Sequence, residues 1–525
     1  MRRKFNVTGT CIPEENYMVD ITEKLEQIKK MIDAKEYFTI NRGRQYGKTT
    51  TLSRLRRFLA DEYTMISVSF EGMGDSSFAS EEKFCQTLIR KISNALRFTD
   101  VTKEYQEKWK NSEVKSFDSL GEHITDMCEG KKLVLMIDEV DKAANHRIFL
   151  NFLSKLREKY LARRDGMDYT FHSVVLAGVY DIKNIKLKMI QEGLLTPTPA
   201  ETKTYNSPWN IAVSFEVDMS FSKKEIMGML LEYEQDFQTG MNIDEVAEEI
   251  YSYTSGYPFL VSLVCQCLDG KLARNWTRSG IIEAVRIITE DPLPNTLFDD
   301  LFKNIRNHQA LSDFLYEILM EGEVYRFSRG DEVIEQGLRY AFISIVDRDI
   351  RVHNKIFEIV ITNYFISKER REVKKLVKNS IEVDVVNGEQ LNIELFFEKF
   401  NAHYQKYYSN RDKDFIEREA AFLFLFFLQP YLNGKGTFYL ESKPNFATGK
   451  RMDIIISYSG VEFIVELKIW RGEKRKQDAY RQLTDYVKKR HAEKGYLLTF
   501  DFRKKKEIKQ EWIEVHKIKV LDVQV

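Results

Sequence analysis

The sequence predicts an α/β protein in which two α/β modules are separated by a mainly helical region and a charged connector. Three observations support this prediction. A glycine-containing loop that ends at Lys48 lies between a β-type run and a helical run. A continuous apolar run ends in the carboxylates Asp138 and Glu139. Near the end of the chain, Asp453 precedes a Glu-x-Lys triplet by thirteen residues.

Length and composition are those of an ordinary globular protein. A chain of 525 residues is expected to form about two to four domains, each with its own core. The 80 basic and 80 acidic residues balance, so net charge indicates no partner. The first residues lack the apolar stretch of a signal peptide, and the apolar run 420–428 is shorter than the roughly 20 residues of a membrane span. We therefore expect a cytoplasmic protein that does not enter a membrane, with its five cysteines reduced.

The first chemical signal is the loop 41–50, which reads NRGRQYGKTT. It follows the predicted strand 37–40 and precedes the predicted helix 51–59, which is the context of a phosphate-binding loop. Backbone N–H groups and the helix N-terminus would bind phosphate oxygens, while Lys48 would reach the β- and γ-phosphates and Thr49 would hold Mg²⁺. The predicted nucleotide contacts are Gly43, Arg44, Gln45, Gly47, Lys48, Thr49 and Thr50.

The second signal is the run 133–139, which reads LVLMIDE. A strand buried on both faces is continuously apolar, and its carboxyl end delivers carboxylates to a nucleotide crevice. We assign Asp138 to the Mg²⁺ shell and Glu139 to orienting the attacking water. A further strand at 173–178 leaves the sensor of the γ-phosphate unidentified. Arg163 and Arg164 are either arginine fingers or, the interpretation that we favour, a solvated helix end.

These segments resemble the AAA-like ATPases that are related to the STAND class. The resemblance implies that residues 1–220 form an AAA-like P-loop ATPase core with ATP and Mg²⁺ as cofactors. That family commonly replaces the first glycine of the loop with a basic residue, which is Arg42 here. The segments that carry the resemblance are Phe5–Val19, RQYGKTT, LVLMIDEVD and Ser207–Ala212.

Residues 221–366 are predicted to form a helical lid and a winged-helix-like region. Ser222 and Glu225 form the pattern of a capping box at a helix start. The resemblance implies that Pro258, in a Gly-x-Pro sequence, begins a lid helix and faces the nucleotide base. The alternative is a plain helix–helix turn. Residues 367–400 are predicted to be a connector, because their first part is strongly charged.

The third signal lies in the last module, residues 401–525. Asp453 begins a predicted strand, and Glu466 and Lys468 project from one face of the next, because strand side chains alternate. Two carboxylates can bind Mg²⁺ through oxygen atoms, the metal can activate a water, and Lys468 can orient that water. The stretch 471–510 carries 14 Lys and Arg residues against six Asp and Glu, which suits a phosphate backbone.

This arrangement resembles the PD-(D/E)xK nuclease-like domains that are fused to AAA-like ATPases. The resemblance assigns catalytic roles to Glu419 on the preceding helix and Gln482 on the following helix, beside Asp453, Glu466 and Lys468. One departure is that the glycine stands four residues before Asp453, where many relatives have three.

Together these signals predict an ATP-binding and ATP-hydrolysing switch that controls a Mg²⁺-dependent nuclease. We expect a homo-oligomer that cleaves DNA rather than RNA, in a role such as antiviral defence. One alternative is a signalling switch whose nuclease-like domain only binds a partner or nucleic acid. Another is a structural oligomer that binds nucleotide but hardly turns it over.

Overall fold

The computed structural model describes residues 3–110, 113–179, 209–290, 295–320, 323–373, 385–387, 390–407, 417–432, 436–442, 452–470, 472–490, 492–501, 503 and 508–525. The chain forms two compact units, one of residues 1–221 and 339–341 and one of residues 222–338 and 342–525. In the described part of the chain, no helix has the length and apolar character that crossing a membrane requires.

The first unit is built on a four-stranded parallel sheet with the strand order β1-β4-β3-β2. Its strands are β1 (Tyr37–Asn41), β2 (Thr64–Ser69), β3 (Leu133–Asp138) and β4 (Ser173–Gly178). Every residue of β3 and β4 is buried, as expected for parallel strands covered on both faces. Val213 adds a parallel bridge beside Phe38, so the described residues 209–213 lead to the outer edge of β1.

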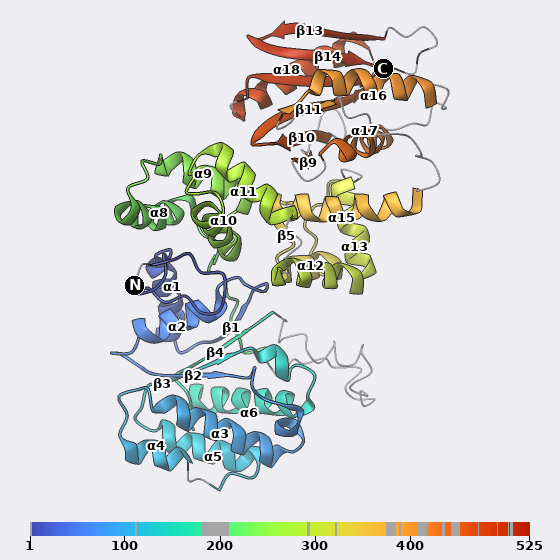
Figure 1. Cartoon of the computed structure of the whole chain (residues 1–525). Coiled ribbons are helices and arrows are strands. Elements are labelled where there is room, and N and C mark those ends of the chain that lie inside the picture. Colours follow the sequence, from blue (N-terminus) through green and yellow to red (C-terminus); the bar gives the residue numbers. More distant parts are fainter. Residues whose placement is uncertain are drawn as a thin grey trace, which may run out of the picture. The chain divides into compact units, whose positions relative to one another are not determined.

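Helices cover both faces of this sheet (Figure 1). On one face lie α1 (Thr22–Asp33) and α2 (Lys48–Phe58). On the other lie α3 (Glu81–Leu96), α5 (Phe117–Cys128) and α6 (Arg147–Arg164), with α4 (Lys103–Lys110) beside them. The core on that second face is aromatic, with Phe84 in contact with Phe70, Phe117 and Phe152.

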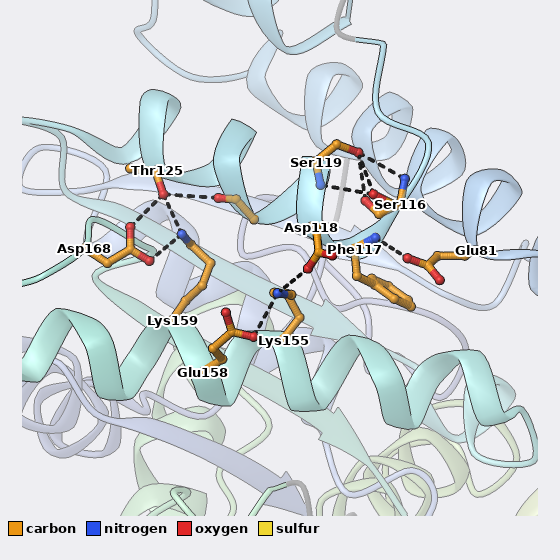
Figure 2. A network of polar contacts seen from close by, with 11 residues as sticks. Glu81, Ser116, Phe117, Asp118, Ser119, Thr125, Lys155, Glu158, Lys159 and Asp168 are labelled. Atoms are coloured by element: carbon orange, nitrogen blue, oxygen red, sulfur yellow. Dashed lines mark hydrogen bonds and ion pairs between the residues drawn. The ribbon is translucent and has the colours of Figure 1, made fainter.

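A polar network joins α5 and α6 on the side of this unit (Figure 2). The Lys159 side chain is 4% exposed, and its ammonium lies 2.6 Å from both the Asp168 carboxylate and the Thr125 hydroxyl. One turn earlier on α6, Lys155 pairs with Asp118, whose side chain is 87% exposed. Two lysines on one helix therefore have ion pairs of very different burial.

The second unit begins with four helices, α8 (Lys223–Phe237), α9 (Ile243–Thr254), α10 (Pro258–Gly270) and α11 (Arg278–Glu290). The expected capping box at Ser222 and Glu225 is present. Next come α12 (Thr296–Asn307), α13 (Gln309–Met320), α14 (Glu332–Arg339), the hairpin of β5 (Ile343–Val346) and β6 (Asp349–Val352), and α15 (Lys355–Val373). These four helices and the hairpin include the region that we predicted to be winged-helix-like, and that assignment stays a prediction.

The last part of the second unit is a six-stranded mixed sheet with the strand order β13-β14-β12-β11-β10-β9. A short hairpin, β7 (Val386–Asn387) and β8 (Gln390–Leu391), and two helices, α16 (Ile393–Tyr407) and α17 (Glu417–Leu432), precede it. Its strands are β9 (Gly436–Ser442), β10 (Met452–Tyr458), β11 (Val461–Ile469), β12 (Lys494–Phe500), β13 (Lys509–Val515) and β14 (Ile518–Gln524). The predicted connector 367–400 therefore contains the end of α15 and the start of α16.

Helices cover the two faces of this sheet as well. A Cβ at Gly495 would lie 3.0 Å from both Leu483 and Val487, so α18 (Glu473–Lys489) packs closely on the face to which Gly495 belongs. Phe397 on α16 stacks on Tyr496, one residue further along β12 and therefore on the other face. Helix α17 packs on α16, and the apolar run 420–428 belongs to it.

Candidate functional sites

The phosphate loop has the backbone form that its sequence predicts. Gly47 is the N-cap of α2 and has φ 78°, a left-handed conformation that glycine adopts without steric cost. Gln45 is also left-handed, with φ 55°. At Gly43, an added Cβ would lie 2.7 Å from the carbonyl oxygen of Tyr340, so a side chain does not fit there without displacing the backbone.

The side chain of Lys48 folds back into the phosphate loop that precedes it. Its ammonium donates to the carbonyl oxygens of Arg42 at 2.9 Å and Gly43 at 2.8 Å. Burial lowers the pKa of Lys48, although the nearby carboxylates Asp141 and Glu139 oppose this effect. Because both hydrogen-bond acceptors are neutral carbonyl groups, the positive charge is suited to a bound phosphate.

Thr49 and Asp138 lie together, as a shared magnesium site requires. The Thr49 hydroxyl donates to Asp138 Oδ2 at 2.6 Å, and Asp138 Oδ1 accepts the backbone N–H of Glu139 at 2.9 Å. A hydroxyl oxygen next to a carboxylate oxygen is a hard-ligand pair that Mg²⁺ prefers. These two residues therefore fit the Mg²⁺ site that the sequence predicts.

Glu139 follows β3 directly and has a left-handed backbone, with φ 55°. Its position after a buried parallel strand brings its carboxylate to the carboxyl edge of the sheet. Burial, and then the charge of Asp138, raise the pKa of Glu139. A carboxylate with raised proton affinity is suited to accept a proton from an attacking water.

Asp141 is a site residue that the sequence reasoning missed. Its Oδ2 accepts the backbone N–H of Val179 at 2.7 Å, directly after β4. A Cβ at Gly178 would lie 2.8 Å from Asp141 Oδ1, so glycine is what permits this close approach. The second aspartate of the sequence DEVD was the available signal. The γ-phosphate sensor, which the sequence left unidentified at the end of the strand 173–178, stays unassigned, because residues 180 and 181 lie outside the described residues.

Two further residues of the loop hold the chain segment 215–221, which leads to α8. Arg42 donates to the carbonyl oxygen of Val217 at 3.0 Å, and its guanidinium lies over the ring of Phe215. The Tyr46 hydroxyl lies 2.7 Å from the hydroxyl of Ser220. The basic residue at the usual glycine position therefore anchors the segment that precedes α8.

Other predicted residues have structural partners. The Thr50 hydroxyl accepts the backbone N–H of Cys11 at 3.3 Å, while Arg44 is exposed. Arg163 donates to the carbonyl oxygens of Lys35 and His172, which precede β1 and β4 at the sheet edge opposite the phosphate loop. Arg163 thus lies at a helix end, as we expected, but it is half-buried and ties the amino ends of two strands together.

Pro258 is the first residue of α10, after left-handed Ser255 and Gly256. Proline at this position is favoured because the first turn of a helix needs no N–H there. Pro258 is buried in the second unit, and its assignment to the nucleotide base stays a prediction.

In the C-terminal sheet, backbone register brings the predicted nuclease residues onto adjacent strands. Asp453 on β10 lies directly opposite Glu466 on β11, and Glu441 on β9 lies opposite Asp453. The backbone register therefore aligns three acidic positions across β9, β10 and β11. The sequence reasoning did not single out Glu441, because its place beside Asp453 depends on strand pairing.

Glu466 and Lys468 are described with their side chains. The Glu466 side chain is 1% exposed, and its Oε1 lies 3.3 Å from the Lys468 ammonium. Gln482 is half-buried on α18, the helix that covers the sheet face of Glu466. Glu419 lies in the first turn of α17, and the side chains of Glu419 and Asp453 lie outside the described residues. Among the described side chains, no three His, Cys, Asp or Glu residues form a metal-binding group.

The predicted basic surface lies partly on α18. Its exposed basic residues are Lys474, Arg475, Arg481, Lys488 and Lys489, with acidic Glu473 and Asp485 also exposed. Such a helix offers several cations to a phosphate backbone from the same side of the sheet as Glu466.

Comparison with known proteins identifies the region around the first site. The family model described as an AAA-like domain matches residues 17–328, more than half of the chain. An uncharacterized WD repeat-containing protein of Synechocystis sp. is 25% identical over 268 residues, which are 46% of this chain and 20% of that protein. The chain thus matches only a fifth of that relative's length.

Among solved structures, the Walker-type ATPase of Pyrococcus abyssi is 14% identical, with a TM-score of 0.47 over 68% of this chain and 99% of its own. The RuvB Holliday junction branch migration motor of Thermotoga maritima is 13% identical, with a TM-score of 0.31 over 69% of this chain and 96% of its own.

Proposed function

Because the chain belongs to the family of AAA-like domains, we propose that it binds and hydrolyses ATP and that its nucleotide state controls a nuclease in the C-terminal module. The observation that carries the ATPase half is the 2.6 Å contact between Thr49 and Asp138, with Lys48 inside the loop. Lys48 binds the β- and γ-phosphates, and Thr49 and Asp138 hold the metal. Bound Mg²⁺ supplies charge neutralisation to the phosphates.

Glu139 orients the attacking water and accepts its proton, which its raised pKa favours. The test is phosphate release by the full chain, with Lys48→Ala, Asp138→Ala and Glu139→Gln beside wild type. Lys48→Ala should lose ATP binding, whereas Glu139→Gln should keep binding and lose turnover. Wild-type turnover in Glu139→Gln would overturn the assignment of Glu139, and ATP binding unchanged in Lys48→Ala would overturn the site.

For the nuclease half, the supporting observation is the register of Asp453 against Glu466, with Lys468 next to Glu466 on the same face. In this proposal the two carboxylates hold Mg²⁺. Lys468 orients the attacking water and opposes negative charge that develops on the phosphate. Exposed cations of α18 bind the nucleic-acid backbone. We propose DNA as the substrate and a homo-oligomer as the working form, in a role such as defence against foreign nucleic acid.

The nuclease test uses plasmid DNA, single-stranded DNA and RNA with Mg²⁺ or Mn²⁺, each with and without ATP. Wild type is compared with Asp453→Ala, Lys468→Ala and Lys48→Ala. Metal-dependent cutting that Asp453→Ala abolishes would support the nuclease, and the Lys48→Ala reaction shows whether ATP controls it. If no substrate is cut although ATP turnover is intact, the nuclease is refuted and the partner-binding switch replaces it.

A further inference from the structure

Glu462 is a buried carboxylate at the start of β11 that neither proposed site uses. Its side chain is 3% exposed. Its Oε2 accepts from Arg278 at 2.7 Å, and its Oε1 accepts from Tyr253 at 2.9 Å and from Arg490. The Tyr439 hydroxyl also accepts from Arg490, at 2.9 Å. We call these five residues the Glu462 joint.

The joint connects two parts of the second unit that lie far apart in sequence. Tyr253 on α9 and Arg278 on α11 come from the first helices of that unit. Glu462 on β11 and Tyr439 on β9 come from the C-terminal sheet, and Arg490 directly follows α18. Since a buried charge whose partner is removed is strongly unfavourable, the two parts are held in one specific arrangement.

Glu462, on the sheet side of the joint, lies on the same strand face as two of the proposed nuclease residues. Glu462, Glu466 and Lys468 have the same parity on β11, so they lie on the same face of one strand. Four residues of strand separate Glu462 from Glu466, about 13 Å at roughly 3.3 Å per residue. Because β11 is hydrogen-bonded to both β10 and β12, a displacement at Glu462 would reach Glu466 through the backbone of one paired strand.

The helical side of the joint is connected to the phosphate loop through the chain. Arg42 and Tyr46 hold the segment 215–221, and Lys24 donates to the carbonyl oxygen of Ser220 at 2.6 Å. This segment continues directly into α8, which packs on α9, the helix that carries Tyr253. A phosphate that reorders the loop therefore acts on the chain segment that leads to the joint.

We propose that the Glu462 joint transmits the nucleotide state of the ATPase site to strand β11 and thereby regulates the C-terminal site. The inference rests on the proposed function, because it assigns the regulation of the proposed nuclease. Coupling of this kind is reciprocal, so nucleic acid bound at the C-terminal site changes the affinity for ATP by the same factor.

The decisive variant is Tyr253→Phe, which removes one hydroxyl donor on the helical side and leaves Arg490 and Tyr439 in place. The matched control is Tyr251→Phe on the same helix, where the side chain is 39% exposed. Hydrogen–deuterium exchange of the β11 peptide, residues 461–469, is measured in the full chain with and without a non-hydrolysable ATP analogue. This readout does not require cleavage.

We expect a nucleotide-dependent change in β11 exchange in wild type and Tyr251→Phe, and a smaller change in Glu462→Gln and in Tyr253→Phe, where the bond from Arg278 to Glu462 remains, at unchanged affinity for the analogue. Where wild type cuts a substrate, Tyr253→Phe should bring the ratio of rates with and without ATP closer to one. If no substrate is cut, the nuclease fails while the exchange result still decides the joint. A wild-type response in Tyr253→Phe, or no response in wild type, would refute the joint.

Discussion

Replacing Lys159 by methionine should destabilise the first unit far more than the same change at Lys155. The Lys159 side chain is 4% exposed, and its ammonium lies 2.6 Å from the carboxylate of Asp168, whose side chain is 17% exposed. Removing one partner of a buried pair costs about 3–5 kcal/mol, and the partial exposure of Asp168 places our expectation near about 3 kcal/mol. Lys155 pairs with Asp118, which is 87% exposed, so Lys155→Met should cost about 1 kcal/mol or less.

The measurement is urea unfolding followed by hydrogen–deuterium exchange in peptides from β3 and β4, because these strands report on the first unit alone. With a urea dependence of about 2–3 kcal/mol per molar, Lys159→Met should lower the midpoint by about 1 M and Lys155→Met by less than about 0.5 M. Equal shifts for the two variants would refute the reasoning, since burial is what distinguishes the two pairs.

The same pair gives a dependence on pH with a defined sign. Burial raises the pKa of Asp168, but the hydrogen bonds from Lys159 and Thr125 together lower it by more. The pKa of Asp168 therefore lies below its ordinary value. The stabilisation is therefore present above the ordinary pKa of an aspartate and is lost as the pH falls through the folded-state pKa. Lys159→Met should remove this loss at acidic pH, and an unchanged acid profile would contradict it.

Two further predictions concern Gly178 and His172. Gly178→Ala puts a Cβ 2.8 Å from Asp141 Oδ1, so ATP turnover should fall by roughly 10–100-fold in a phosphate-release assay. The control is Gly228→Ala, which has open space around the added Cβ and should leave turnover unchanged. Burial and nearby cations lower the pKa of His172 to about 4. The free energy of unfolding should therefore decline as the pH falls from about 6.5 toward 4. Because His172 is partly exposed, we expect a decline on the order of 1–2 kcal/mol. His172→Gln should flatten that decline in urea midpoints, and an unchanged slope would show that another group causes it.

The sequence predicted those features that short-range pattern determines. The strand–loop–helix around Lys48, the buried strand that ends at Asp138 and the capping box at Ser222 are all local. Their signals are residue types at fixed spacing, such as a glycine where the backbone is left-handed at Gly47. These features place most of the first candidate site.

The interactions that the sequence did not predict join residues that are distant along the chain. The sequence favours Arg163 as part of a solvated helix end, yet it donates to carbonyl oxygens next to β1 and β4. The bond from Val179 to Asp141 spans 38 residues, and its only local trace is an aspartate after Glu139. Sequence spacing contains no information on which distant carbonyl or N–H group a side chain meets.

Glu462 illustrates the same limit at the proposed regulatory contact. In sequence it is one more acidic residue of a strand, where an exposed position would be the ordinary interpretation. Its burial follows from Tyr253 and Arg278, which are 209 and 184 residues away, and from Arg490 beyond the next helix. Only the fold brings two arginines to one carboxylate four residues before Glu466. The proposed coupling therefore rests on contacts that only the folded second unit brings together.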